Sequence, residues 1–72
     1  MPTNEVREGD TVVIDGIAYV FGSSAAEAYN ICAAAVAQGG AIHPYACIAL
    51  QIKGKEASLS FPFTEVQTAL QQ

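Results

Sequence analysis

The sequence predicts an α+β domain in ββαββα order, with a four-stranded, mainly antiparallel sheet, one long helix on a face and a short C-terminal helix. Three observations predict this fold. Two pairs of short runs rich in β-branched and aromatic residues each flank a turn, which is typical of β-hairpins. A long alanine-rich segment between the pairs carries helix start and stop signals. A second start signal follows the last strand, and the order of the strands in the sheet stays open.

The first hairpin is expected between Thr11 and Phe21. Asp15-Gly16 separates its two apolar runs, and this dipeptide tolerates the positive φ angles of a type I′ turn. A two-residue loop places Ile14 opposite Ile17 and aligns their side chains on one face.

The long helix is expected from Ala25 to about Gln38. Ser24-Ala-Ala-Glu27 has the spacing of a capping box, in which the serine oxygen accepts an amide of the first turn and the glutamate reaches back. Gly39-Gly40 supplies a left-handed stop. At 100° per residue, one stripe of the helix faces the core: Ala25, Tyr29, Cys32, Ala33 and Val36.

The second hairpin is expected at residues 47–53 and 57–61, where apolar and polar residues alternate and Pro62 ends the run. Thr64-Glu-Val-Gln67 repeats the capping-box spacing and predicts a short helix to about Leu70.

One core should therefore unite both hairpins and the long helix, within an ordered domain of residues 10–72 that follows a loose N-terminal lead-in at residues 1–9. Its expected members are Val12, Ile14, Ile17, Tyr19, Tyr29, Cys32, Val36, Ile48, Leu50, Ile52, Leu59 and Phe61.

Composition excludes several classes of protein. The 72 residues are 51% hydrophobic and 14% charged, which is too apolar for a disordered chain. The net charge of −4 and the three basic residues argue against direct nucleic-acid binding. The longest apolar runs fall far short of the roughly 20 residues that span a bilayer. No secretory signal is visible, and two cysteines without one are typical of reduced thiols, so we expect a cytoplasmic protein.

Cys32, Cys47 and His43 are the residues from which a thiol- or metal-dependent enzyme could be built. Cys32 lies on the core stripe of the helix, Cys47 begins a strand and His43 precedes a proline. These positions favour structural roles, so we expect no catalytic residue, no metal and no cofactor, and an enzyme is a distant alternative.

Two sets of residues are candidates for contacts with other proteins. The first is acidic and would suit a partner with a basic surface: Glu5, Glu8, Asp10, Asp15 and Glu27. The second lies on the helix away from the core stripe, where small side chains permit close approach, and would join two copies into a homodimer: Ile31, Ala34 and Ala35. The alternative is that the C-terminal helix covers Ile31.

In size and layout the chain resembles small phage-encoded inhibitors, including anti-CRISPR proteins and inhibitors of host polymerases. No signature residue carries this resemblance, so it assigns no binding residue. We expect a non-enzymatic protein-binding module, an inhibitor or adaptor that docks on a larger, partly basic complex. The alternative is a structural or assembly subunit that self-associates through a sheet edge or the alanine-rich helix.

Overall fold

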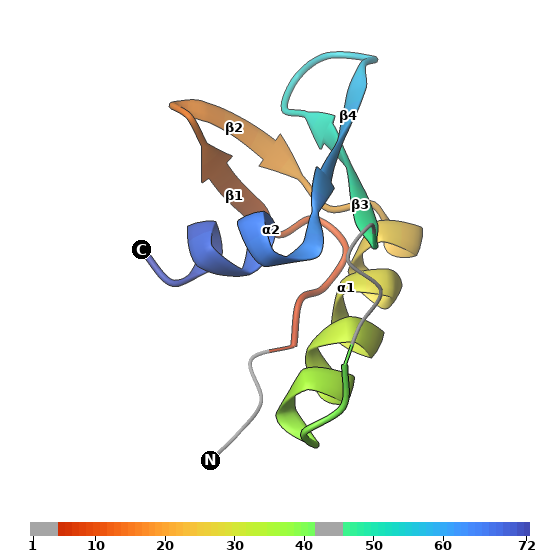
Figure 1. Ribbon diagram of the computed structural model, residues 1–72. Helices are drawn as coiled ribbons and strands as arrows, with labels where there is room; N and C mark the ends of the chain where they lie inside the picture. Colours follow the sequence, from red (N-terminus) through yellow and green to blue (C-terminus); the bar gives the residue numbers. More distant parts are fainter. Residues whose placement is uncertain (1–4, 42–45) are drawn as a thin grey trace.

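Two β-hairpins with a helix between them form one four-stranded sheet in the order β1-β2-β3-β4, and every neighbouring pair is antiparallel (Figure 1). The computed structural model describes residues 5–41 and 46–72. Its elements are β1 (Thr11–Ile14), β2 (Ile17–Val20), α1 (Ser23–Ala37), β3 (Cys47–Ile52), β4 (Ser58–Pro62) and α2 (Phe63–Leu70). The predicted fold class and element order are confirmed.

The first hairpin has the predicted register, with Ile14 opposite Ile17 and Val12 opposite Tyr19. Asp15 and Gly16 have φ angles of 53° and 80°, the left-handed values that a type I′ turn requires. The pairing of β2 with β3 is shorter: Tyr19 pairs with Ile52 and Val20 with Gln51, and the Lys53 N–H donates to the Ala18 carbonyl at 3.0 Å. The sheet is therefore two hairpins held side by side at one end.

The start of α1 differs from the prediction. The helix begins at Ser23 with Gly22 as its N-cap, and no side chain caps it. Ser24 already lies inside the first turn, so the predicted capping box with Glu27 does not form and that prediction is wrong. Capping by a side chain needs an extended backbone at the capping residue, and here Gly22 holds that conformation.

The end of α1 agrees with the prediction. Gly39 has a φ of 82°. Its N–H donates to the Val36 carbonyl at 3.0 Å, and the Gly40 N–H donates to the Ala35 carbonyl at 2.8 Å. These two bonds make a Schellman motif, which satisfies the last carbonyls of the helix.

α2 begins at Phe63, one residue before the predicted cap, with Pro62 as its N-cap and no side-chain cap. The second capping box, at Thr64, is therefore also wrong. Thr64 instead uses its carbonyl to accept a hydrogen bond from the Thr68 hydroxyl at 2.9 Å.

The core lies between one face of the sheet and the two helices. α2 contacts β1, β3 and β4, whereas the only strand that α1 closely contacts among the described residues is β3. Figure 1 shows α2 running beneath the hairpins, and α1 meeting the sheet with its first turns and then extending away from it. The fully buried large side chains are Phe21, Phe63, Ile48, Leu50 and Val66.

Three predicted core residues are exposed: Ile17 by 46%, Leu59 by 50% and Val36 by 40%. Ile17 and Leu59 are in the expected register, but Ile17 lies beside its hairpin turn, and Leu59 lies on the edge strand β4, opposite the fully buried Leu50. Val36 lies in the last turn of α1, beyond the sheet. The hydrophobic pattern identifies which face of an element is apolar, and the length of the covering helices decides how much of that face is buried.

Replacing Leu50 with Ala should lower the free energy of unfolding by about 2–5 kcal/mol, because Leu50 is 0% exposed and its loss leaves a cavity. Ile17→Ala is the matched control and should cost about 1 kcal/mol or less, since its side chain is half in solvent already. Urea unfolding followed by circular dichroism measures both. Equal losses in the two variants would contradict the core described above.

Candidate functional site

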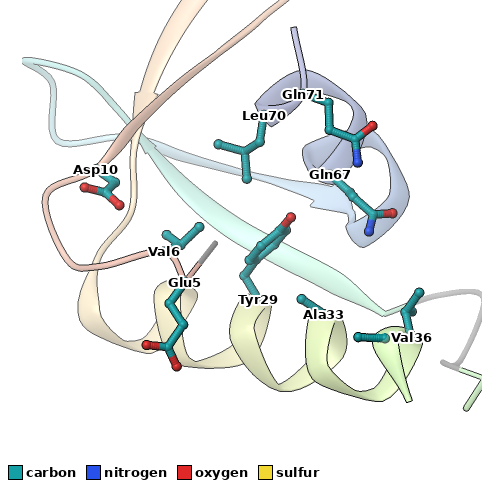
Figure 2. Close-up of a pocket in the computed structure, with 10 residues that line it drawn as sticks. Glu5, Val6, Asp10, Tyr29, Ala33, Val36, Gln67, Leu70 and Gln71 are labelled. Carbon is teal, nitrogen blue, oxygen red and sulfur yellow. The ribbon is translucent and has the colours of Figure 1, made fainter. Parts of the chain in front are cut away.

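A cavity lies between α1, α2 and the segment that precedes β1. We call it the α1–α2 cleft, and its volume is about 400 Å³. Sites for small ligands and side chains are commonly of about this size, mainly apolar with a few polar groups. The cleft is lined by Glu5, Val6, Asp10, Tyr29, Ala33, Val36, Ala37, Gln67, Leu70 and Gln71 (Figure 2).

One wall of the cleft is the N-terminal segment, which is tied to α1. The Val6 N–H donates to Asn30 Oδ1 at 2.8 Å, and Asn30 Nδ2 donates to the Val6 carbonyl at 2.7 Å. The Asn30 amide thus pairs with the backbone as a neighbouring strand would, and Val6 is only 7% exposed. Residues 5–9 are therefore held at Val6, although the sequence predicts a loose lead-in at residues 1–9; residues 1–4 lie outside the described part.

Tyr29 forms the floor of the cleft. Its ring lies 5.0 Å from that of Phe63 and 5.9 Å from that of Phe21, so it joins α1 to the start of α2 and the end of β2. Figure 2 shows the ring rising from α1 beside Val6, with its hydroxyl directed toward Gln67 and Leu70 of α2. The side chain is 6% exposed, and no hydrogen bond among the described residues uses its hydroxyl.

Burial raises the pKa of the Tyr29 phenol above its ordinary value of 10.0, because the charged phenolate is poorly solvated there. The group is therefore a neutral hydroxyl at physiological pH.

The structure brings together two of the five acidic candidates. Glu5 and Asp10 both line the cleft, and Asp10 Oδ2 also accepts a hydrogen bond from the Arg7 N–H at 2.9 Å. Asp15 lies in the hairpin turn at the other end of β1, roughly 16 Å away at 3.3 Å per residue. Glu8 and Glu27 are exposed but do not line the cleft.

The thiol and metal candidates are not assembled into a site in the part of the chain that the structure describes. Cys32 is half-buried on α1, Cys47 is exposed at the start of β3, and both are free thiols. Residues 5–41 and 46–72 hold no group of three or more His, Cys, Asp and Glu side chains able to bind a metal ion. His43 lies outside the described residues.

Ile31 is the most exposed large apolar side chain among the described residues, at 65%. The expectation that it faces away from the core stripe is confirmed, and the alternative that α2 covers it is wrong, because α2 lies against the sheet. Ala34 is exposed beside it, and Ala35 is half-buried. The segment from Ile31 to Ala37 contains no polar residue, although much of it faces solvent.

Comparison with protein-family models, with curated proteins and with solved structures finds no match to this chain. None of the described helices is long and apolar enough to cross a membrane.

Sequence reasoning placed Tyr29 in the core but missed the cleft that it underlies. The lining residues that lie outside the predicted core and candidate sets are Val6, Ala37, Gln67, Leu70 and Gln71. Val6 is an isolated apolar residue in a polar segment, and Asn30 lies next to Tyr29 on the helix. The position of the Asn30 amide beside the core stripe could have indicated that another segment packs there, because a part-buried polar group needs a hydrogen-bonding partner.

The raised pKa of Tyr29 predicts a loss of stability in alkali. Its contribution is fully present below pH 10.0, the ordinary value, and is lost as pH rises through the higher folded pKa, because the unfolded chain gives up the proton first. Tyr29→Phe removes this contribution. The stability difference between wild type and Tyr29→Phe, measured by urea unfolding, should therefore be constant at neutral pH and change above pH 10.0. A difference that stays constant into alkali would refute the burial of the phenol.

Proposed function

We propose that the chain is a non-enzymatic protein-binding module whose α1–α2 cleft receives a segment of a larger partner. One observation carries the proposal: a cleft of about 400 Å³ with an apolar floor, a neutral phenol and two carboxylates, and no basic side chain among its described lining residues. This combination suits an apolar side chain accompanied by Lys or Arg. The partner's docking segment is therefore both apolar and basic.

The negative charge at the cleft favours a partner whose docking segment is positively charged. Glu5 and Asp10 are exposed at the lining, and the whole chain carries a net charge of −4. Complementary charge speeds encounter and disfavours acidic partners more than it adds affinity. The exposed apolar surface of Val36 and Leu70 would supply most of the binding free energy. A small inhibitor or adaptor that acts on a partly basic complex would use charge in this way to select its partner and apolar contact to hold it.

A second candidate function is that of an assembly subunit, which self-associates. The observation that favours it is the uncharged, largely exposed segment from Ile31 to Ala37. A helix that is apolar on all sides is normally buried, either in its own protein or against another.

The proposed function is tested by filling the cleft. Ala33 lines it, whereas Ala34 is exposed and does not. Ala33→Leu and Ala34→Leu add the same atoms and keep good helix formers. A labelled amphipathic peptide of Leu and Lys should bind the wild type and Ala34→Leu, and bind Ala33→Leu about tenfold more weakly or worse, a loss of about 1.4 kcal/mol or more. Fluorescence anisotropy measures the binding.

A second pair of peptides tests whether the cleft prefers a basic partner. A peptide in which Glu replaces Lys should not bind. Glu5→Gln should weaken binding of the Lys peptide at low salt, while Glu27→Gln, outside the cleft, should leave it unchanged. Equal binding of the two peptides, or equal binding by Ala33→Leu and Ala34→Leu, would contradict the proposed site.

A further inference from the structure

We propose that the free edge of β4 is the surface through which two copies of this chain pair, with Ser58 of each copy bonded to Ser60 of the other. The inference rests on the second candidate function, self-association, and not on the cleft. The sequence favours the side of α1 around Ile31 as the dimer contact. We instead assign the contact to the β4 edge, because the structure defines which of its backbone groups are free to form hydrogen bonds.

The hydrogen bonds of β4 with β3 show which backbone groups are left over. The Ile52 N–H donates to the Ala57 carbonyl at 2.8 Å, and the Phe63 N–H donates to the Ala46 carbonyl at 3.0 Å. In an antiparallel ladder, residues that face the neighbouring strand alternate with residues that face away. Ala57, Leu59, Phe61 and Phe63 therefore bond β3. The backbone groups of Ser58, Ser60 and Pro62 point to the free edge.

Antiparallel pairing of two β4 strands then has one best register. Pro62 has no N–H, so the outward donors of the strand are Ser58 and Ser60. Placing Ser58 opposite the second copy's Ser60 uses both donors of each copy. A pairing of Ser60 with Ser60 would set Ser58 against Pro62 and leave a carbonyl without a donor.

The same register buries an exposed side chain. Leu59 is 50% exposed and lies between the two serines. In this pairing it stands opposite the second copy's Leu59 at a position without hydrogen bonds, where side chains approach most closely. The contact is symmetric, so it closes on a dimer and does not propagate into a fibre.

Charges at the ends of the strand agree with a second copy as the occupant. Antiparallel pairing brings the β3–β4 turn of one copy beside the start of α2 in the other. The turn carries Lys53 and Lys55 against Glu56, and α2 has Glu65 in its first turn. Opposite net charges therefore meet at both ends of the pairing.

The other edge of the sheet is protected. The Phe21 N–H donates to the Asp10 carbonyl at 2.9 Å, so Thr11 and Val13 point outward from β1 by the same alternation. Asp10 and Asp15 flank that strand, and the end of α2 lies beside it, where Ala69, Leu70 and Gln72 line a hollow with Thr11, Val12 and Val13. Charges and covering elements block edge pairing. Among the described residues no further strand covers the free edge of β4, and Ser58, Leu59 and Ser60 are exposed; the charges that flank β4 are of both signs, so they oppose those of a second copy in this register.

Ser60→Pro tests the proposal, because it removes an outward N–H and leaves every bond to β3 intact. Sedimentation velocity of the full chain over the micromolar range should show a dimer for the wild type. Ser60→Pro should raise the dissociation constant about 100-fold, from two lost hydrogen bonds. Ser60→Ala, which keeps the N–H, and Val13→Pro, which removes an outward N–H of β1, should dimerise like the wild type.

Amide exchange by NMR on the unmodified protein gives an independent result. The Ser58 and Ser60 amides should exchange more slowly as protein concentration rises, and this holds even if Ser60→Pro does not fold. A dimer that survives Ser60→Pro, or that Ile31→Glu breaks instead, overturns the β4 pairing but leaves self-association standing. A wild type that stays monomeric at high micromolar concentration overturns both, and neither result bears on the cleft.

Discussion

The position of α1 depends on the ring of Tyr29. The helix has three buried residues, and two of them, Ala25 and Ala26, are too small to hold it alone. Tyr29 contributes the only large buried side chain in the helix and packs its ring against Phe63 and Phe21. Aromatic pairs with centroids 4.5–7 Å apart are worth about 0.5–1.5 kcal/mol each beyond the area they bury. One side chain therefore links α1 to the sheet and to α2.

This attachment accounts for the accessible surfaces of the helix. Because α1 is held by its first half, its second half extends past the sheet and keeps Val36 in solvent, while Ile31 is exposed because it faces away from the core stripe. The space between this overhang and α2 is the α1–α2 cleft, closed on the third side by the segment that Asn30 holds. No residue of β4 lines the cleft. A partner in the cleft and a second copy on the β4 edge would therefore use different surfaces.

Local patterns were sufficient to predict the secondary structure. The Asp15-Gly16 turn, the register of the first hairpin and the Gly39 stop all depend on residues close in sequence. Both capping-box predictions were wrong because Gly22 and Pro62 occupy the N-cap positions. The spacing of a capping box does not show whether an adjacent residue will take the N-cap position instead. The burial of Val6, Phe21 and Phe63 was missed for a different reason. These residues lie at or beyond the ends of the expected strands, and only the arrangement of the helices in space covers them.

The central claim is that Tyr29 and Phe63 stabilise the fold as a coupled pair. A double-mutant cycle with Tyr29→Leu, Phe63→Leu and the double variant tests it by urea unfolding. Leucine keeps both sites apolar and removes the ring-to-ring contact at 5.0 Å. We predict a coupling free energy of about 1 kcal/mol, with the double variant less destabilised than the sum of the single variants. Strictly additive losses would show that α1 is held by something other than this contact.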